Sequence, residues 1–552
     1  MISASDDGQH AGSLTSGDLR LFAQLRGTPL FAIDLNLVRQ QVAAFRAALT
    51  DVKIYYSVKT NPLPAVLETL RQLGTSFDVA TIHEAELVLS CGAAAEDILY
   101  SHPVRSDQEI RHAAPLGLNF YTVDSLEELD RVASYTRSAR FLIRLNVKSN
   151  ASLYDYREKF GVFPGEAQRL LDAALERGLP IAGLAFMVGS PSLSLEPFRD
   201  ALATVESLLL ANYDRLPALR MIDIGGGFPL RYGFGDVPMI DEIGQLVHSF
   251  RLRVPSDVRI IAEPGRFIVG PAGVLATTVM RRVPRAAKDW LFVDATTYSG
   301  VIERIESGGR LAYPITASTA ADAACTTFEV AGRTMDPDDL IGSEVSLPCD
   351  VNAGDLLLVQ DAGAYSTSFF TTYHSLPHPA VVICDSAYAD AVRIEQTSTG
   401  LHGIVARREF AAGERVLEIS GWSVAHRTGT SFEVERDRHL EPSAFGAYLN
   451  HSCDPNCGAV IDEQGALWIV ARRAIAADEE VTIDYAMTEF ETAEMAKTKC
   501  RCGTAACRGR ITGFRDLPEA TKQAYACFIA PHLVDRRRES QAPARAVAGT
   551  SG

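Results

Sequence analysis

The sequence predicts a multidomain protein of the α/β and β classes: a (β/α)₈ barrel, an antiparallel β domain and then a second, mostly β unit. Three observations lead to this fold class. At 552 residues the chain is too long for one hydrophobic core, so two or three domains are expected. Between about residues 50 and 270, eight short apolar runs alternate with helical patterns. After residue 270 the apolar runs become β-branched, with turns between them.

The eight apolar runs are interpreted as barrel strands, because near-continuous hydrophobicity is typical of parallel strands buried on both faces. They lie at residues 54–59, 77–80, 98–101, 120–123, 140–146, 184–189, 221–226 and 259–265. Helical segments such as PLPAVLETLRQLG separate most of them, and several end in a glycine that suits a helix C-terminus. This alternation favours a barrel, with a doubly wound open sheet as the alternative.

The expected domain boundaries follow these changes of pattern. Residues 1–18 are expected to be disordered, 19–270 to form the barrel, 271–385 the antiparallel β domain, 386–498 a mostly β domain and 499–515 a cysteine-containing segment. Residues 516–552 are expected to hold a C-terminal helix and a disordered tail. The tail sequence DRRRESQAPARAVAGTSG is polar and contains Pro, Ala and Gly, a composition that cannot bury a core.

Composition and charge narrow the classes of function. The formal net charge of -16 argues against broad binding to nucleic acid, whose affinity depends largely on neutralising phosphates. No run approaches the ~20 consecutive apolar residues of a membrane-spanning helix, and the N-terminus lacks the apolar centre of a secretory signal. Three of only ten cysteines crowd into residues 500–507, which favours a metal site in a reducing compartment over disulfides. We therefore expect a cytoplasmic enzyme.

Residues that carry chemistry fall at the carboxyl ends of the predicted barrel strands, where βα loops build the site of such barrels. Lys59 ends the first strand. A desolvated lysine there has a lowered pKa and forms Schiff bases, although it could also reach solvent from the barrel mouth. Strand seven leads into Gly225–Gly227, whose bare amides can hold a phosphate or simply form a turn. Strand eight ends in Glu263 and Arg266, a carboxylate that can keep a ring nitrogen protonated and a cation that can bind phosphate.

The motifs around these residues resemble one enzyme family. YYSVKTN, FDVATIHE, KFGV, FMVGS, DIGGGFP, EPGR and GAYS occur in order within residues 20–385, as in the ornithine/lysine/diaminopimelate decarboxylases, which use pyridoxal 5'-phosphate (PLP) in an alanine-racemase-like barrel. The resemblance implies that Lys59 binds PLP covalently and that Glu263 pairs with its pyridine nitrogen. It implies a phosphate site formed by Ser190, Gly225, Gly226, Gly227, Arg266 and Tyr365, supporting residues Asp78, Glu84 and Arg144, an amino-acid substrate and a head-to-tail homodimer.

Two positions depart from that family's pattern. The histidine that stacks on the cofactor ring is Met187 here, whose thioether can pack on a ring but cannot donate a proton. The loop that supplies a cysteine across the dimer interface carries Met335 instead, and Met335 cannot protonate a carbanion. Asp336 is retained as a catalytic-site residue for the substrate's distal group, which with GGGFP favours a basic amino acid. Three outcomes stay open: decarboxylation with water or Tyr373 as proton donor, diversion to transamination or oxidation, or a cofactor-binding pseudoenzyme.

Three cysteines near the C-terminus predict a metal site. Cys500, Cys502 and Cys507 supply three thiolates, and a tetrahedral zinc site needs a fourth ligand. Cys453 is the preferred fourth ligand, with Cys457 as the alternative.

Three motifs occur in order in this last third of the chain: AYLNHSCDPN at 447–456, DEEVTIDY at 478–485 and the CxCx₄C cysteines. They resemble the SET-domain lysine methyltransferases with a post-SET zinc segment. The resemblance implies that Asn450 and His451 contact S-adenosylmethionine, that Tyr485 is the active-site tyrosine, and that zinc is bound by Cys453, Cys500, Cys502 and Cys507. Positioning of a neutral amine in a narrow aromatic channel should supply most of the acceleration of methyl transfer. The early cofactor loop keeps Gly403 but has Leu401 where a second glycine is usual.

The main hypothesis is a bifunctional enzyme. It combines PLP-dependent decarboxylation of an amino acid with S-adenosylmethionine-dependent methylation of a protein lysine or another amine. One alternative is a methyltransferase whose PLP-like half is a scaffold or a metabolite sensor. The opposite alternative is a decarboxylase whose SET half only binds a partner lysine.

Overall fold

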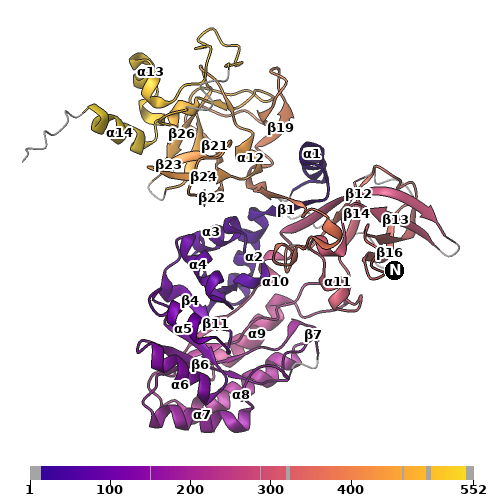
Figure 1. The fold of residues 1–552 in the computed structure, drawn as a ribbon, viewed down its shortest axis with the longest axis vertical. Coiled ribbons are helices and arrows are strands. Elements are labelled where there is room, and N and C mark those ends of the chain that lie inside the picture. Colours follow the sequence, from indigo (N-terminus) through magenta and orange to yellow (C-terminus); the bar gives the residue numbers. More distant parts are fainter. Residues whose placement is uncertain are drawn as a thin grey trace, which may run out of the picture. The chain divides into compact units, whose positions relative to one another are not determined.

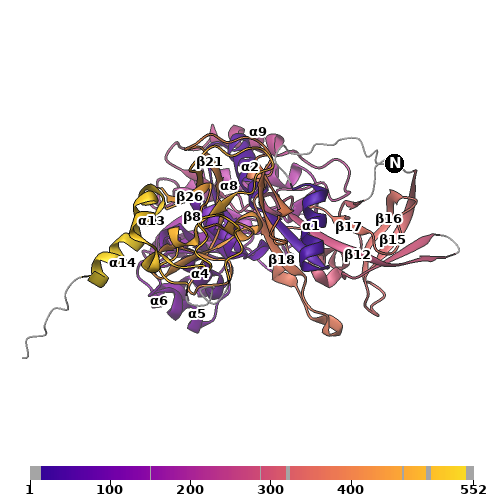
Figure 2. The same ribbon diagram turned by 90° about the horizontal axis from the view of Figure 1, so that it is seen from above.

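The computed structural model describes residues 14–148, 151–285, 288–318, 324–462, 465–492 and 499–541. These residues form two compact units, Thr15–Val382 and a unit whose main part begins at Ile383, with the elements drawn in Figures 1 and 2. Within the described ranges, no helix combines the length and the apolar character that crossing a membrane requires.

The larger unit contains a closed barrel of eight parallel strands, which confirms the predicted fold (Figure 1). Around the barrel the strands are β10 (Met221–Asp223), β11 (Arg259–Ala262), β2 (Val52–Ser57), β3 (Ser76–Val79), β4 (Ile98–Tyr100), β5 (Phe120–Val123), β6 (Arg140–Leu145) and β8 (Ile181–Phe186). Each predicted run overlaps its strand, because buried parallel strands need apolar side chains on both faces. Side chains from several strands, among them Tyr55, Leu99, Leu142, Met221 and Ile261, form one buried cluster, as a filled barrel interior requires.

Helices lie before and between the barrel strands and fix where the βα loops end. They are α2 (Leu35–Ala48), α3 (Pro64–Gln72), α4 (Ile82–Ser90), α5 (Asp107–Ala113), α6 (Leu126–Tyr135), α7 (Pro164–Glu176), α8 (Glu196–Asn212) and α9 (Ile240–Arg251). The Thr81, Ser106 and Ser125 side chains accept hydrogen bonds from the first-turn amides of α4, α5 and α6. Such caps satisfy amides that have no partner within the helix, so these three loops end at defined residues.

The second part of this unit is a β domain whose main sheet has the order β14-β17-β12-β13-β15-β16. The strands are β12 (Gly273–Pro284), β13 (Asp289–Val293), β14 (Ile315–Ala317), β15 (Cys325–Ala331), β16 (Leu340–Pro348) and β17 (Leu356–Val359), with β18 (Ala380–Cys384) attached through β1. Figure 2 shows β12, β15, β16 and β17 side by side. The sheet is not wholly antiparallel, because β13 and β15 run parallel.

Two expectations about the N-terminus are wrong. The strand β1 (Leu30–Asp34) falls in the range expected for the barrel, 19–270, yet it pairs with β12 of the β domain, with Leu30 opposite Ala276. A short buried strand needs hydrogen-bonding partners, so it pairs with a sheet whose open edge lies next to it in space. The elements that adjoin it in the sequence do not determine which sheet that is. The helix α1 (Ser16–Arg26) begins inside the range 1–18 expected to be disordered, because Thr15 and Asp18 cap it reciprocally. The tail expected to be disordered begins at Asp535, but the helix α14 (Pro531–Gln541) includes its first seven residues, so this expectation is wrong for residues 535–541. The remaining disorder expectations, for residues 1–13 and 542–552, lie outside the described residues.

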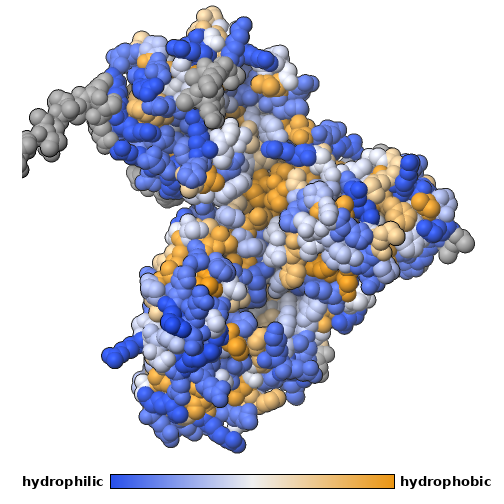
Figure 3. Space-filling model, in the orientation of Figure 1, coloured by the Kyte–Doolittle hydropathy of each residue, from blue (hydrophilic) through white to orange (hydrophobic). Residues whose placement is uncertain are grey.

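The C-terminal unit is mostly β, as predicted. Its strands are β19 (Val392–Gln396), β20 (His402–Ala406), β21 (Arg415–Glu418), β22 (Gly421–Val424), β23 (Phe432–Glu435), β24 (Arg438–Pro442), β25 (Asn450–His451), β26 (Cys457–Ile461), β27 (Leu467–Ala471) and β28 (Thr482–Ile483), followed by the helices α13 (Glu519–Ala524) and α14 (Pro531–Gln541). Hydrophilic residues predominate on the face of this unit that Figure 3 presents. The parallel pairing of β25 with β28 brings the two motifs that were separate in the sequence together.

Candidate functional site

A cavity of about 310 Å³ lies at the carboxyl ends of the barrel strands. The predicted residues that line it are Lys59, Arg144, Met187, Ser190, Gly226, Gly227, Glu263, Arg266 and Tyr365. Among the described residues assigned to this site from the sequence, Asp78, Glu84, Gly225 and Asp336 lie outside the lining. The sequence therefore identified the right end of the barrel, and the four outliers need separate explanation.

Lys59 follows β2 in a short 3₁₀ turn, and its ammonium group contacts Asp78 at the end of β3. The Lys59 Nζ atom lies 2.9 Å from Asp78 Oδ2 and donates a hydrogen bond of 2.6 Å to Ser57 Oγ. Burial lowers the pKa of Lys59, but Asp78, Tyr365 and Glu263 together raise it by more, so the net pKa is raised. The lysine side chain is still 44% exposed, because it faces the cavity. Asp78 thus acts from behind the lysine and holds it toward the cavity.

Two further contacts hold the Asp78 region in place. Ser101, at the end of β4, donates a hydrogen bond to Asp78 Oδ1. Glu84 Oε2 accepts the Ala80 N–H at 2.6 Å, which ties the first turn of α4 to the β3 loop. Burial raises the pKa of Glu84. These contacts explain why Asp78 and Glu84 belong to the site although neither lines the cavity.

Two carboxyl groups lie together at the ends of the neighbouring strands β10 and β11. Asp223 is buried, accepts the Gly225 N–H at 2.9 Å and is hydrogen-bonded to Glu263. Burial raises the pKa of Asp223 to about 7, and burial with the nearby charge of Asp223 raises that of Glu263 well above its usual value. Near neutral pH the pair therefore retains a proton. A protonated ring nitrogen would satisfy the same two carboxyl groups, so the pair fits a pyridine cofactor. The sequence reading assigned a role to Glu263 but none to Asp223, although both end adjacent strands.

The glycine run adopts a conformation that side chains would prevent. Gly225 and Gly227 have φ values of +65° and +91°, in the left-handed region that favours glycine. A Cβ atom on Gly226 would lie 2.9 Å from the Glu263 carbonyl oxygen and 3.7 Å from Met187 Sδ. The run therefore packs closely against the end of β11 and Met187. Gly226 and Gly227 line the cavity, where their amides suit an anion such as a phosphate.

Arg266 is fixed on this side of the cavity by a buried partner that the sequence did not indicate. Its two terminal nitrogens donate to the carboxylate of Glu303 at 2.7 and 2.6 Å. The guanidinium carbon lies 4.9 Å from the ring centroid of Tyr365, and Nε lies 3.5 Å from Ser190 Oγ. A bidentate pair sets the guanidinium plane, so Arg266 presents Nε beside Ser190. These positions fit a phosphate group bound between Gly226–Gly227, Ser190 and Arg266.

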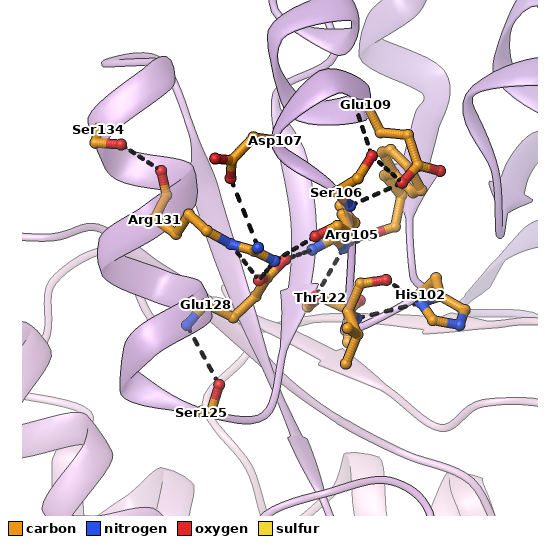
Figure 4. Close-up of polar contacts among 12 residues, drawn as sticks. His102, Arg105, Ser106, Asp107, Glu109, Thr122, Ser125, Glu128, Arg131 and Ser134 are labelled. Carbon is orange, nitrogen blue, oxygen red and sulfur yellow. Dashed lines mark hydrogen bonds and ion pairs between the residues drawn. The ribbon is translucent and has the colours of Figure 1, made fainter.

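The opposite wall contains residues that the sequence analysis did not single out, among them His102 and Thr122. Buried Arg105 supports Thr122 directly, as Figure 4 shows. It donates to the Tyr100 carbonyl at 2.5 Å, to the Thr122 carbonyl at 2.8 Å and to Glu128 at 3.0 Å. A buried charge is stable when it is paired and hydrogen-bonded, so Arg105 ties the end of β4 to β5. An arginine four residues after the predicted strand at 98–101, in SHPVR, was the available sequence signal.

The loop that carries Met335 and Asp336 is the main departure from the predicted site. Met335 is 88% exposed. Asp336 accepts hydrogen bonds from the Tyr298 hydroxyl and the Asp338 amide, and the Tyr298 bond holds the pKa of Asp336 below its usual value. Asp336 is thus an ionised carboxylate on the surface, outside the cavity of its own chain.

The C-terminal unit has its own small cavity, of about 50 Å³, beside Tyr485. The Tyr485 hydroxyl donates to the Leu449 carbonyl at 2.9 Å, and burial raises its pKa to about 12. Phe432, Thr488 and Glu489 also line this cavity. A neutral phenol bound to a backbone carbonyl can orient an amine and a methyl group, which is the chemistry expected of Tyr485.

Asn450, His451 and Gly403 lie close together nearby. Asn450 Nδ2 donates to Glu480 Oε1 at 2.8 Å and to the His402 carbonyl at 3.1 Å. A Cβ atom on Gly403 would come within 2.6 Å of both Asn450 and Glu480, so a larger residue would displace them. The Tyr485 amide donates to His451 Nδ1 at 3.3 Å. The pairing of β25 with β28 therefore places the two predicted cofactor residues next to the predicted catalytic tyrosine.

Four cysteine thiols form a candidate metal centre. The sulfur atoms of Cys453, Cys500, Cys502 and Cys507 all lie within 4.8 Å of one another. Backbone amides of Arg508 and Gly509 donate to Cys453 and Cys507 at 3.4 Å. Cys457 lies in β26 instead, where burial raises its pKa to about 12. A tetrahedral set of four thiolates is the donor set that structural zinc prefers, so the arrangement fits zinc with Cys453 as the fourth ligand.

Comparison with known proteins identifies a family region in each of the two units. Residues 35–270 match the pyridoxal-binding domain of pyridoxal-dependent decarboxylases, and residues 402–486 match the SET domain. The ornithine decarboxylase of Schizosaccharomyces pombe is 30% identical over 387 residues, which cover 67% of this chain and 87% of that protein. The diaminopimelate decarboxylase of Pseudomonas fluorescens is 30% identical over 420 residues, 72% of this chain and 95% of that protein.

A solved structure shows the same likeness over the first unit. The lysine/ornithine decarboxylase of Vibrio vulnificus, crystallised with putrescine, has 31% sequence identity and a TM-score of 0.62, and the match covers 67% of this chain and 98% of the other. Both the sequence and the fold of an entire decarboxylase chain are therefore present here, with a further domain after it. The chain belongs to the pyridoxal-dependent ornithine/arginine/diaminopimelate decarboxylase family and carries a SET domain fused to its C-terminal side.

Proposed function

We propose that the protein is a bifunctional enzyme that decarboxylates a basic amino acid with PLP and methylates an amine with S-adenosylmethionine. One observation carries the proposal: in each unit the principal chemical groups of its family lie in or beside a cavity, with the departures at Met187, Met335 and Leu401 already described. In the first unit these are Lys59 with Asp78, and Glu263 with the glycine run. In the second they are Tyr485 with Asn450 and His451.

In the decarboxylase unit, Lys59 would hold the cofactor covalently, with Asp78 setting its direction and charge. Glu263 and Asp223 would keep the pyridine nitrogen protonated, and Ser190, Gly226 and Arg266 would bind the phosphate. PLP bound in this way would withdraw electrons from the carbon that loses its carboxyl group. Met187 would cover one face of the ring by packing alone. The proton that completes an amine product would come from a group other than Met335, such as water or Tyr373.

The same loop, which carries Met335 and Asp336, supports both a basic amino-acid substrate and a homodimer. Two relatives in this family are named ornithine decarboxylase and lysine/ornithine decarboxylase. Asp336 is ionised and lies outside its own chain's cavity, while Met335 and Tyr373 are exposed by 88% and 43%. We infer a homodimer in which this loop reaches the partner's cavity, where Asp336 would bind the distal ammonium of ornithine or lysine.

In the SET unit, zinc would be bound by Cys453, Cys500, Cys502 and Cys507. Structural zinc contributes folding energy to the segment that it organises, here the chain that follows Tyr485. S-adenosylmethionine would bind beside Asn450, His451 and Gly403, and the Tyr485 hydroxyl would orient the amine toward the methyl group. Four free thiols in a metal site favour a reducing compartment, so we propose that the protein acts in the cytoplasm.

The test is mass spectrometry of the purified full chain with PLP, S-adenosylmethionine and a panel of amino acids. Loss of 44 Da from ornithine or lysine is expected, since decarboxylation releases CO₂, and Lys59→Ala should abolish it. Transfer of a methyl group is expected to be lost in Tyr485→Phe. Aldehyde or ketone products in place of amines would instead indicate diversion to transamination or oxidation. Such diversion is open to this chain because Met335 stands where the family has a proton-donating cysteine. Intact cofactor binding without turnover of any amino acid would indicate a scaffold or sensor.

A further inference from the structure

Glu489 lines the same cavity as the Tyr485 hydroxyl, although carboxylates are rarely buried. It is only 4% exposed, and its amide donates to the Tyr485 carbonyl at 2.9 Å. The chain turns once between the two residues, so both side chains are held by the same short segment. A buried carboxylate in the cavity of the catalytic tyrosine is a recognition group for whatever enters that cavity.

The charge of Glu489 is only partly compensated by the protein. Its Oε1 atom accepts the Glu433 N–H at 3.0 Å, and its Oε2 atom lies 3.4 Å from Arg427. Arg427 also donates to the Glu491 carbonyl at 2.9 Å. Burial outweighs these contacts and raises the pKa of Glu489 to about 7. A cation placed beside it would therefore gain a strong, charge-assisted hydrogen bond.

The other charged groups around Glu489 are already paired. Glu433, on β23, accepts from Arg536 of α14 at 2.7 Å and lies 3.9 Å from His532. Among the described residues that line this cavity, Glu489 is the carboxylate, and Arg427 lines the cavity beside it. Each Glu489 oxygen has one contact here, although a carboxylate can accept about four hydrogen bonds. A methyl acceptor that carries a second ammonium group would donate a further hydrogen bond to it.

The first unit would make a molecule of this kind. Removing the carboxyl group from ornithine or lysine leaves a diamine, with an ammonium at each end and no negative charge. A lysine within a polypeptide has one side-chain amine, and a free amino acid still has its carboxylate, which Glu489 would repel.

We propose that the methyl acceptor of the SET unit is the diamine released by decarboxylation, and that Glu489 binds the ammonium that is not methylated. The proposal rests on the proposed function of both units. The neutral amine nitrogen attacks the methyl carbon of S-adenosylmethionine, the carbon–sulfur bond breaks with its electron pair going to sulfur, and the nitrogen loses one proton to water. The products are an N-methyldiamine and S-adenosylhomocysteine.

The experiment compares putrescine with butylamine, which has the same four carbons and lacks the second amine. The full chain with bound zinc is given S-adenosylmethionine and each amine in turn, and methylated products are measured by mass spectrometry. We expect kcat/KM for putrescine to exceed that for butylamine by about tenfold or more, as a hydrogen bond to a charged group would give. In Glu489→Gln this ratio should fall to near one, because putrescine turnover drops toward that of butylamine. Circular dichroism and zinc content equal to those of the wild type show that the variant is folded.

The matched control is Glu491→Gln, which removes a carboxylate two residues away whose side chain pairs with Arg515. It should leave the ratio unchanged. A lysine-containing peptide and free ornithine complete the panel. Faster methylation of either one than of putrescine overturns the inference while leaving the methyltransferase function intact, and so does an equal loss of both amines in Glu489→Gln. Failure to methylate any acceptor contradicts the proposed methyltransferase function itself.

Discussion

Asp223 and Glu263 end neighbouring barrel strands, β10 and β11, and are joined there by a hydrogen bond between their side chains. Like charges this close cannot both be ionised without cost, so one proton is retained between them near neutral pH. Their position at the base of the cavity makes this proton part of the cofactor site. It also makes the stability of the cofactor-free protein depend on pH.

Asp223→Asn should reduce that pH dependence. A carboxyl group whose pKa is raised on folding contributes stability that is present below its unfolded pKa of about 4 and is lost as pH rises through the folded value, which is about 7 for Asp223. The Tm of the cofactor-free wild-type protein should therefore fall more between pH 4 and pH 7 than that of Asp223→Asn. Thermal unfolding at a series of pH values measures the difference. Parallel curves for the two proteins would show that Asp223 is not protonated in this window.

Met335→Cys should change the balance of products. If the missing thiol limits protonation of the product carbon, restoring it should raise the ratio of amine to aldehyde or ketone by about a hundredfold, the lower end of the range that a positioned acid contributes. Mass spectrometry of products from ornithine or lysine gives the ratio. Met335→Ser, which cannot act as the same acid, is the control. An unchanged ratio in Met335→Cys would mean that another group supplies the proton.

Removal of the metal should stop methyl transfer and spare the decarboxylase unit. Cys502→Ser, or a strong chelator, loosens the segment after Tyr485, and such local opening costs far less than global unfolding. We expect S-adenosylmethionine turnover to be lost while amino-acid decarboxylation continues. Cys453→Ser should be as damaging as Cys502→Ser.

Cys457→Ser is the matched control for the metal prediction. Cys457 is buried in β26 and lies outside the cluster of four sulfur atoms. Zinc content, measured by plasma emission spectroscopy, should stay at one ion per chain in Cys457→Ser and fall in the other two variants. Protein purified without stoichiometric zinc would contradict the metal assignment itself.

Complementation tests whether Asp336 works in the partner's cavity. Lys59→Ala and Asp336→Ala should each be inactive in decarboxylation, but a mixture that exchanges subunits contains heterodimers with one intact site. Random exchange should restore activity to about a quarter of the wild-type value, because half of the dimers have one of two sites intact. Steady-state decarboxylation of the mixture measures this. Light scattering should show a dimer at micromolar concentration, and a monomer with full activity would rule out a shared site.

Much of the barrel and its site could be predicted because both depend on local patterns. Apolar runs of strand length with helices between them define the barrel, and chemistry concentrates at the carboxyl ends of its strands. Lys59 and Glu263 were found by this rule. Asp223 was overlooked although it obeys the same rule. The role of a single carboxylate cannot be inferred until the strand next to it in the barrel, and therefore its partner Glu263, is known. Glu303 could not be found, since its partner Arg266 is remote in sequence.

The sequence by itself determined the two family units, their order, and the thiols available for a metal, because each depends on residue types at short spacings. Only the tertiary structure decided which sheet receives Leu30–Asp34, whether Cys453 or Cys457 joins the cysteine cluster, and that Glu489 lies in the Tyr485 cavity. These outcomes depend on where distant segments meet. Cys453 and Cys457 are four residues apart, and only the pairing of β25 with β28 carries the first toward Cys500 while β26 buries the second.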